Sequence, residues 1–424
     1  MLFLDWETQM GGDLTLKKMP TMQYVRETET IALGLAQGNG PVEVQRGGYI
    51  IPEDWTCAHN AAFDAAICNH HLGHKAKFWL CTMSMARYAI SQGVLSPDTM
   101  TSLDNFGAKG NTEEALKGSQ DELDKYVEQD INIMRDLFKK LIKHVPPEEL
   151  RLIDLHVRMA AEPRLHIDKA RLKEAAKPLD GTLAQLRKND KFAQALRAYG
   201  LEPETKEGKR GTAYAFAKSD DFMRQLHRHS DPRVRTLVKL RESSMSSIVR
   251  TRAQRMLDIG DPLPCPLLYY GAHTGRSSGL DKLNMQNLPR DGALRRSLLA
   301  PPGHSLVICD SSQIEVRTLA WLAGEEELLE AFRQGVDPYK LFATKLYSVP
   351  LRDVTKEQRR VAKAAVLALG YGQGAGGFLG YCEGFGVPMD PGTAQHVVGV
   401  YRASHPHIVN YWSSTYRQLV RSGG

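Results

Sequence analysis

The first third of the chain carries the hydrophobic pattern of a mixed α/β fold. The stretch LFLDWET, residues 2–8, is a short apolar run with acids at alternate positions, and IALGLAQ, residues 31–37, has the length and character of a second strand. Residues 122–145 carry apolar side chains at the three- and four-residue spacing of an amphipathic helix. Pro146 and Pro147 end that helix and indicate a domain boundary.

From about residue 148 to 262 the pattern is polar and helical, with a concentration of positive charge near its end. Between Arg233 and Leu257 there are seven basic residues and one acid, Glu242. A solvated helix face is one interpretation. A helical hairpin that grips phosphates is another, because Lys, Arg and Ser make most protein contacts to the DNA backbone. Composition alone leaves both open.

The pattern becomes strand-like again at LLYYGAHTGRSS, residues 267–278, and then at the short apolar run of residues 306–309, which ends in Asp310. We expect a buried strand there that carries a carboxylate at its tip. Such an acid is costly unless it is solvated, paired or bound to a cation. From about residue 325 onward the pattern is mainly helical.

Composition bounds the class of protein. The 424 residues, 42% hydrophobic and 25% charged, suit a globular chain of two or three domains, and the net charge of +6 is mildly basic. The six cysteines include no CxxC pair, so we expect neither a disulfide framework nor a zinc ribbon, and a reducing cytoplasm fits best. An acid at position 5 argues against a signal peptide, and no apolar run is long enough to span a membrane.

Four carboxylates form the first candidate site. Asp5 and Glu7 alternate along the first strand and so share one face. The segment HNAAFDAA places an asparagine and Asp64 four residues apart, and YVEQD does the same for Tyr126 and Asp130, so each pair shares a face if the segment is helical. Such a cluster suits two Mg²⁺ or Mn²⁺ ions, one activating water and one stabilising the leaving oxygen of a phosphodiester.

Together these segments resemble the three motifs of the DEDDy 3′→5′ exonucleases. The resemblance covers residues 1 to about 145. It implies an RNase H-like fold, a single-stranded DNA 3′ end as substrate, Tyr126 in the water-positioning role, and four metal ligands: Asp5, Glu7, Asp64 and Asp130.

A second set of motifs resembles the family A DNA polymerases over residues 150–424. DSSQIEVR, residues 310–317, resembles motif A of that family, and HTGRSSGLDKLNMQNLPR, residues 273–290, resembles the segment that precedes it. RRVAKAAVLALGYGQG, residues 359–374, resembles motif B, with its R-x3-K-x7-YG spacing. All three occur in the family's order.

The residues of these motifs suit nucleotide chemistry. Asp310 would hold a magnesium ion. Arg359, Lys363 and Leu367 are spaced by four, so two cations for a triphosphate and an apolar surface for a base or sugar face one cleft, with Tyr371 further round the same helix stripe. By resemblance, Glu315 is the steric gate that excludes a 2′-hydroxyl. The primer–template contacts that the resemblance implies are Thr274, Arg276, Gln286 and Asn287.

The fold expected from both resemblances is a multidomain chain of α/β and α+β structure, with a right-hand polymerase domain after the exonuclease. The expected parts are an RNase H-like exonuclease domain (1–147), linker and thumb helices (148–265), a palm with motif A (266–324) and incomplete fingers with motif B (325–424). The function implied is template-directed DNA synthesis with 3′→5′ proofreading. It would use primer–template DNA, deoxynucleoside triphosphates and two Mg²⁺ or Mn²⁺ ions per active site. The alternative is an exonuclease with an inactive polymerase-like DNA-binding region.

The sequence departs from the family pattern in three places. Ser311 stands where the family usually carries an aromatic residue, and Leu367 where it carries Phe or Tyr. No His-Asp-Glu-like motif C follows motif B, since the acids after Gly372 are Glu383 and Asp390. We therefore expect a fragment, a palm completed by another polypeptide, or lost polymerisation. An exonuclease that begins at residue 1, with no 5′-nuclease before it, resembles the compact plan of phage polymerases.

Three further patterns favour ordinary structural roles. GQGAGG, residues 372–377, fits a dinucleotide-binding fingerprint, but it follows a helix rather than a strand. In CNHHLGH, His70 and His74 would share a helical face, yet no second ligand pair is evident, so surface histidines are favoured over zinc. Core packing is favoured over base stacking for the aromatic cluster Tyr401, Tyr411, Trp412 and Tyr416.

Overall fold

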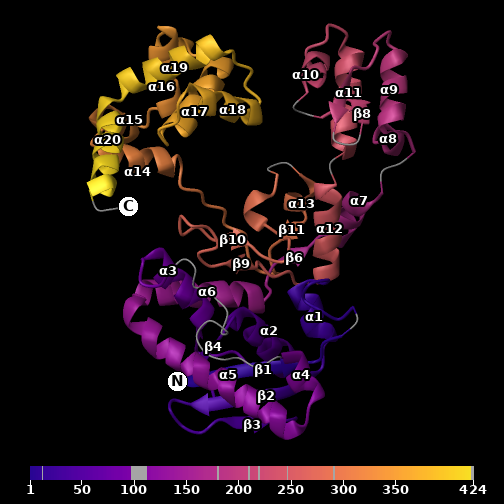
Figure 1. The fold of residues 1–424 in the computed structure, drawn as a ribbon, viewed down its shortest axis with the longest axis vertical. Coiled ribbons are helices and arrows are strands. Elements are labelled where there is room, and N and C mark those ends of the chain that lie inside the picture. The colour runs from indigo at the N-terminus through magenta and orange to yellow at the C-terminus, as the bar shows by residue number, and fades with distance from the viewer. Residues whose placement is uncertain are drawn as a thin grey trace. The chain divides into compact units, whose positions relative to one another are not determined.

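The computed structural model describes residues 1–11, 13–96, 112–178, 181–208, 211–217, 220–245, 247–289 and 292–421 (Figure 1). The chain forms two compact units, Met1–Leu306 and Val307–Gly424. Each unit has its own hydrophobic core. The four domains expected from the sequence, with their boundaries, stay predictions.

A five-stranded sheet with strand order β3-β2-β1-β4-β5 forms the centre of the N-terminal part. Its strands are β1 (Leu2–Thr8), β2 (Thr30–Gln37), β3 (Glu43–Gln45), β4 (Trp55–Ala58) and β5 (Phe78–Cys81). β1 pairs antiparallel with β2 and parallel with β4. The two strands predicted at residues 2–8 and 31–37 are therefore confirmed.

Helices cover both faces of this sheet. They are α1 (Thr21–Glu27), α2 (Ala61–Leu72), α3 (Thr82–Ser91), α4 (Thr112–Lys117), α5 (Gln120–Leu141) and α6 (Pro147–Ala161). Phe3 on β1 packs edge-on against Phe138 of α5, whereas the indole of Trp6 donates to the Cys68 sulfur of α2. Because successive strand residues face opposite sides, α5 and α2 lie on opposite faces, and Asp5 shares the face of α5.

The long amphipathic helix predicted at residues 122–145 is confirmed in type and nearly in extent. Ser119 and Glu122 form a capping box that starts α5, and a 3₁₀ turn, η2 (Ile142–His144), follows its end. Pro146 and Pro147 then begin α6, since proline is well suited to the first turn of a helix.

Gly34 permits the close approach of α5 to the sheet. It pairs with Asp5 across β1 and β2, and a Cβ at this position would stand 2.3 Å from Cγ1 of Val127. We expect Gly34→Ala to push α5 outward, to destabilise the protein by about 1–3 kcal/mol and to slow any chemistry that needs Asp130 near Asp5. Thermal melting measures the first effect. An unchanged melting temperature would contradict this packing. Gly374→Ala is the control, because an added Cβ meets open space there and the backbone φ of −87° suits any residue.

The rest of the first unit is mainly helical, as predicted for residues 148–262. Its helices are α7 (Lys169–Ala176), α8 (Gly181–Leu186), α9 (Asn189–Arg197), α10 (Asp221–His227), α11 (Pro232–Met245), α12 (Ile248–Ile259) and α13 (Ala293–Arg296). The hairpin of β7 (Thr205–Gly208) and β8 (Gly211–Tyr214) was not predicted. Its residues are largely exposed and polar, so they carry no hydrophobic alternation.

The strand-like pattern of residues 267–278 corresponds only to very short pairings. β9 (Leu267–Leu268) pairs with β10 (Ser278–Gly279), and β6 (His166–Ile167) pairs with β11 (Leu298–Leu299). A 3₁₀ turn, η3 (Met285–Asn287), follows β10.

The second unit is helical throughout its described regular structure. Its helices are α14 (Ile314–Ala323), α15 (Glu326–Arg333), α16 (Pro338–Tyr347), α17 (Lys356–Leu369), α18 (Ala375–Phe385), α19 (Pro391–Ser404) and α20 (Pro406–Arg421), with a 3₁₀ turn, η4 (Leu351–Asp353), before α17. Its core contains Phe342, Phe378 and Tyr401. The helical pattern predicted from residue 325 onward is confirmed.

The buried strand expected at residues 306–309 is wrong. These residues lie in an irregular segment with no ladder partner among the described residues, and Leu306, Val307 and Ile308 are 44%, 85% and 72% exposed. A strand needs a neighbour for its backbone hydrogen bonds and a cover for its apolar side chains. The local sequence encodes the apolar run but not those partners.

The exposure of this segment predicts the reactivity of Cys309. We expect a maleimide to label Cys309 rapidly in the folded protein, because its side chain is exposed, while Cys57 and Cys68 stay unmodified until unfolding. Burial also raises the pKa of the Cys68 thiol to about 12, which leaves little thiolate to react. Peptide mapping by mass spectrometry measures the order of labelling. If Cys309 is as well protected from labelling as Cys68, the exposed position of segment 306–309 is wrong.

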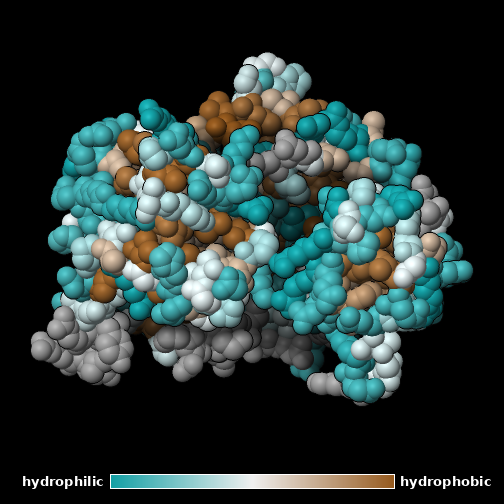
Figure 2. All heavy atoms as spheres, turned by 90° about the horizontal axis from the view of Figure 1, so that it is seen from above, coloured by the Kyte–Doolittle hydropathy of each residue, from teal (hydrophilic) through white to brown (hydrophobic). Residues whose placement is uncertain are grey.

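Figure 2 shows a face on which hydrophilic residues predominate, with apolar residues visible in patches between them. Several large apolar side chains are exposed, among them Trp321 and Val307. Within the described ranges, no helix has both the length and the apolar character needed to cross a membrane.

Candidate functional site

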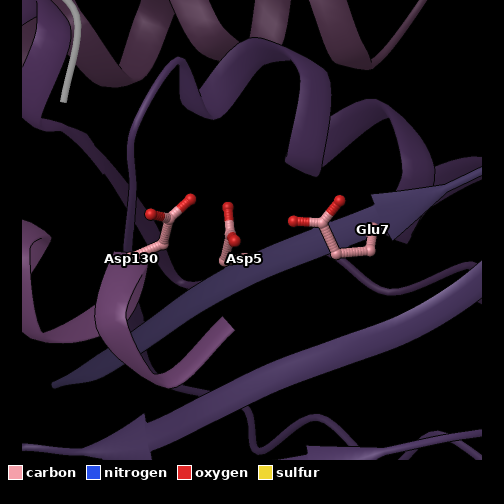
Figure 3. A group of neighbouring side chains, drawn as sticks. All are labelled: Asp5, Glu7 and Asp130. Carbon is pink, nitrogen blue, oxygen red and sulfur yellow. The ribbon is translucent and has the colours of Figure 1, made fainter. Parts of the chain in front are cut away.

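Three carboxylates converge at the face of β1 that α5 covers. Asp5 and Glu7 project from β1, and Asp130 projects from α5 (Figure 3). One oxygen from each lies within 4.8 Å of the others. Glu7 and Asp130 are buried, and Asp5 is partly exposed. The alternation along β1 and the helical spacing of α5 thus bring together three of the four acids that the sequence predicted.

Asp64 stands beside this group rather than within it. It lies buried in the first turn of α2, and its Oδ1 accepts a hydrogen bond from the backbone N–H of Trp6 at 3.2 Å. β4 pairs with β1 only near Leu2 and Phe3, so the carboxylate reaches β1 beyond that pairing. Asn60 precedes α2 in a left-handed conformation, so the expected helical face shared by Asn60 and Asp64 is wrong.

Tyr126 lies one helical turn before Asp130 on α5. Its side chain is buried, and its hydroxyl lies 2.6 Å from Oγ1 of Thr112 on α4. The hydroxyl is therefore held by a contact with α4. Its role in orienting water stays a prediction.

The donor set fits a hard divalent cation. Carboxylate oxygens are preferred ligands of Mg²⁺ and Mn²⁺. Several buried carboxylates close together are costly unless a cation offsets their mutual repulsion and desolvation. Among the described residues, this is the group of acids, histidines or cysteines whose ligand atoms lie close enough to share a metal ion.

The residues predicted to contact primer–template DNA lie on one exposed segment of the first unit. Thr274, Arg276, Gln286 and Asn287 are all exposed. Arg290, at the end of the motif, lies outside the described residues.

Helix α12 fastens that segment. Arg252 donates to the carbonyl of Asn287 at 3.1 Å, and Nε of Arg255 donates to the carbonyl of Asp281 at 2.8 Å. Arg241 of α11 is buried and donates to Oδ1 of Asn189. A solvated helix face is therefore wrong for Arg241, and part of the basic run has a structural role.

In the second unit, two cations of α17 lie around one aromatic ring. The guanidinium of Arg359 lies 5.3 Å from the ring centroid of Tyr339, and Nζ of Lys363 lies 5.9 Å from it. Nε of Arg359 also donates to Asp337 at 2.7 Å. Nζ of Lys363 further lies 5.8 Å from the ring centroid of Phe385. The spacing of four along the sequence therefore places both cations on one side of α17, as predicted.

The charges around Tyr339 affect its ionisation. Burial raises the pKa of the Tyr339 hydroxyl, the carboxylate of Asp337 raises it further, Arg359 opposes this rise, and Glu315 adds to it. Glu315, in the first turn of α14, therefore belongs to the same electrostatic environment as the two cations.

Sequence reasoning missed Asp337, Tyr339 and Phe385. Asp337 accepts from the backbone N–H groups of Tyr339 and Lys340 and so caps α16. A cap could have been inferred from Asp-Pro before a helical pattern. Its ion pair with Arg359 could not, because that contact depends on the packing of α16 against α17.

Of three further predicted positions, Tyr371 and Asp310 differ from expectation. Tyr371 lies beyond the end of α17 and is 69% exposed, so its place on the helix stripe is wrong. Leu367 lies on α17 and is partly buried. Asp310 is exposed in the irregular segment, not at a strand tip.

The histidine, glycine-rich and aromatic patterns have structural roles where the structure describes them. α2 ends at Leu72, so His70 and His74 do not share a helical face. GQGAGG follows α17, as predicted. Tyr401 is buried against Phe342, which confirms its core role, while the side chain of Tyr416 lies outside the described residues.

Known protein families and sequences were found that are similar to this chain. Residues 160–424 match DNA polymerase family A. DNA polymerase I of Pseudomonas aeruginosa is 38% identical over 156 residues, covering 36% of this chain and 16% of that protein. Thermostable DNA polymerase I of Thermus thermophilus is 30% identical over 249 residues, covering 56% and 28%. The DNA polymerase of Bacillus phage SP02 is 34% identical over 121 residues, covering 28% and 18%.

The matches to these curated relatives therefore span less than a third of their length. Among solved structures, the chain resembles the POL domain of Pol1 from M. smegmatis in complex with DNA primer-template and dNTP. The TM-score is 0.66 at 19% identity, covering 100% of this chain and 75% of that one. This likeness shows the fold. Since the family match covers more than half of the chain, the protein belongs to DNA polymerase family A.

Proposed function

We propose that the protein is a template-directed DNA polymerase with a 3′→5′ proofreading exonuclease, acting on primer–template DNA, deoxynucleoside triphosphates and single-stranded 3′ ends. Family membership supports the polymerase half. The observation that carries the exonuclease half is the convergence of Asp5, Glu7 and Asp130 within 4.8 Å. Carboxylates grouped in this way can hold the divalent ions that phosphodiester hydrolysis uses.

At the exonuclease site, Asp5, Glu7, Asp64 and Asp130 would hold two Mg²⁺ or Mn²⁺ ions. The ions would supply an activated water and stabilise the leaving oxygen. The protein would fix the ligands: β1 places Asp5 and Glu7 on one face of the sheet, and α5 brings Asp130 to that face. The Tyr126 hydroxyl, held by Thr112, would orient the attacking water.

At the polymerase site, Asp310 would hold a metal ion and the cations of α17 would bind the triphosphate. Arg359 and Lys363 suit this role because charged donors bind phosphate oxygens strongly. Glu315 would exclude a 2′-hydroxyl. Leu367 and Tyr371 would contact the base or sugar, and the exposed residues of segment 274–287 would contact the primer–template.

A second candidate is an exonuclease with a polymerase-like region that binds DNA without synthesis. Two-metal nucleotidyl transfer needs a carboxylate besides Asp310. Of the two acids after Gly372 in these 424 residues, Glu383 and Asp390, the second has another role. Asp390 caps α19 by accepting from the backbone N–H of Thr393 at 2.9 Å and from its hydroxyl. It therefore has a structural role.

Primer extension tests the proposal and separates the two candidates. A 5′-labelled primer annealed to a longer template is incubated with Mg²⁺ and deoxynucleotides, using the parent chain and an Asp5→Ala/Asp64→Ala variant that cannot trim. Template-directed lengthening by the variant supports the polymerase. Trimming by the parent with no lengthening by the variant supports the exonuclease alone, and loss of both activities overturns the proposal.

A further inference from the structure

Helix α1 holds the backbone that follows Glu7. Tyr24 of α1 is 1% exposed. Its hydroxyl donates to the carbonyl of Gln9 at 2.8 Å and lies 2.9 Å from Oγ1 of Thr8. The strand register shifts between Glu7 and Thr8, although Thr8 still pairs with Thr30 and the Gln9 N–H donates to the carbonyl of Glu29. The Tyr24 hydroxyl adds a restraint at this irregular end of the strand, one residue from a predicted metal ligand.

The other end of α1 is held by a distant part of the chain. Asp281 accepts from the Thr21 hydroxyl at 2.8 Å and from the Thr21 backbone N–H at 3.3 Å. Arg26 of the same helix donates to the carbonyl of Ile259 in α12. Figure 1 shows α1 beside the lower end of α12. Helix α1 is therefore hydrogen-bonded near its first residue to Asp281 and near its last turn to α12.

Asp281 lies within the segment predicted to contact primer–template DNA, between Arg276 and Gln286. It adopts a left-handed backbone conformation (φ 54°), and Arg255 donates to its carbonyl. For a residue other than glycine, such a conformation persists only where surrounding contacts hold it. The side chain that it aims at Thr21 joins two regions that are 260 residues apart.

We propose that Asp281 is a positioning residue for the metal site: through Thr21, helix α1 and Tyr24 it fixes the backbone that carries Glu7. The inference rests on the proposed exonuclease function. Side chains that orient metal ligands from outside typically change metal affinity about 10–100-fold when removed. Asp281 acts through Thr21, α1 and Tyr24 rather than on a ligand directly, so a smaller effect, roughly three- to tenfold, is expected.

Direct binding of Mn²⁺, measured by electron paramagnetic resonance without DNA, tests this role apart from catalysis. We expect Asp281→Ala and Thr21→Val each to raise the Kd of the site roughly three- to tenfold. The double variant should bind Mn²⁺ no more weakly than Asp281→Ala alone, because Asp281→Ala already removes the hydroxyl contact that Thr21→Val removes. Asp281→Asn should recover part of the affinity, since its amide oxygen still accepts from the Thr21 hydroxyl.

The controls separate positioning from general stability and from failure of the proposed function. Asp13→Ala removes an exposed carboxylate, paired with Lys18, from the loop between β1 and α1, and it should leave the Kd unchanged. Measured in an Asp310→Ala background, so that the proposed polymerase site contributes no ion, Asp5→Ala should remove the Mn²⁺ binding; if it does not, the metal site and with it the proposed exonuclease are wrong. If Asp5→Ala removes binding but Asp281→Ala and Thr21→Val keep the parent Kd, the positioning role of Asp281 is refuted.

Discussion

Asp5→Ala is expected to lower the rate of 3′ trimming by a thousandfold or more, on the order of 4 kcal/mol in transition-state stabilisation. Asp5 is the partly exposed member of the carboxylate group, and in Figure 3 it lies between Asp130 and Glu7. Its loss would remove a ligand from the middle of the group. Single-turnover release of nucleotides from 3′-labelled single-stranded DNA measures the effect.

DNA binding is the necessary companion measurement. The DNA-contacting residues predicted in segment 274–287 are distinct from Asp5, so the variant should bind primer–template with the parent affinity. The control is Asp13→Ala, which removes an exposed acid from the loop between β1 and α1. This variant should trim normally. Normal trimming by Asp5→Ala would overturn the exonuclease assignment.

The second large effect is expected at α17. Arg359→Ala and Lys363→Ala should each weaken the binding of deoxynucleoside triphosphate roughly ten- to hundredfold, because a hydrogen bond to a charged group contributes about 1.5–3 kcal/mol. Both cations lie around Tyr339, so they can engage one polyphosphate together. Titration with a fluorescent deoxynucleotide analogue measures the Kd.

A matched cation in the same unit provides the control. Arg333 on α15 is exposed and paired with Glu326 and Glu330. Arg333→Ala removes the same charge from the unit but should leave the nucleotide Kd unchanged. If all three variants bind the nucleotide like the parent, the role assigned to α17 is wrong.

Local periodicity accounts for what the sequence could predict of the exonuclease site. Asp5 and Glu7 share a face because side chains alternate strictly along a strand, and Tyr126 and Asp130 share one because they stand four apart on a helix. The approach of α5 to the sheet could not be predicted. It depends on Gly34 meeting Val127, a contact between distant residues that no local pattern contains.

The failures have the same cause. The apolar run at residues 306–309 was expected to be a strand, but a strand exists only when another segment pairs with it. The ion pair of Asp337 with Arg359 and the hydrogen bond of Asp281 to Thr21 likewise arise from tertiary packing. The residues that sequence patterns did not predict, Asp337 and Asp281, hold other residues in place and are not assigned a direct chemical role.

The most direct test of the central claim is to locate manganese in the protein. Anomalous diffraction from crystals soaked in Mn²⁺ would reveal each bound ion without reference to activity. The account predicts density bounded by the carboxylates of Asp5, Glu7 and Asp130, and its loss in crystals of Asp5→Ala. If crystals of the parent protein soaked in saturating Mn²⁺ show no anomalous density at these carboxylates, the account is contradicted.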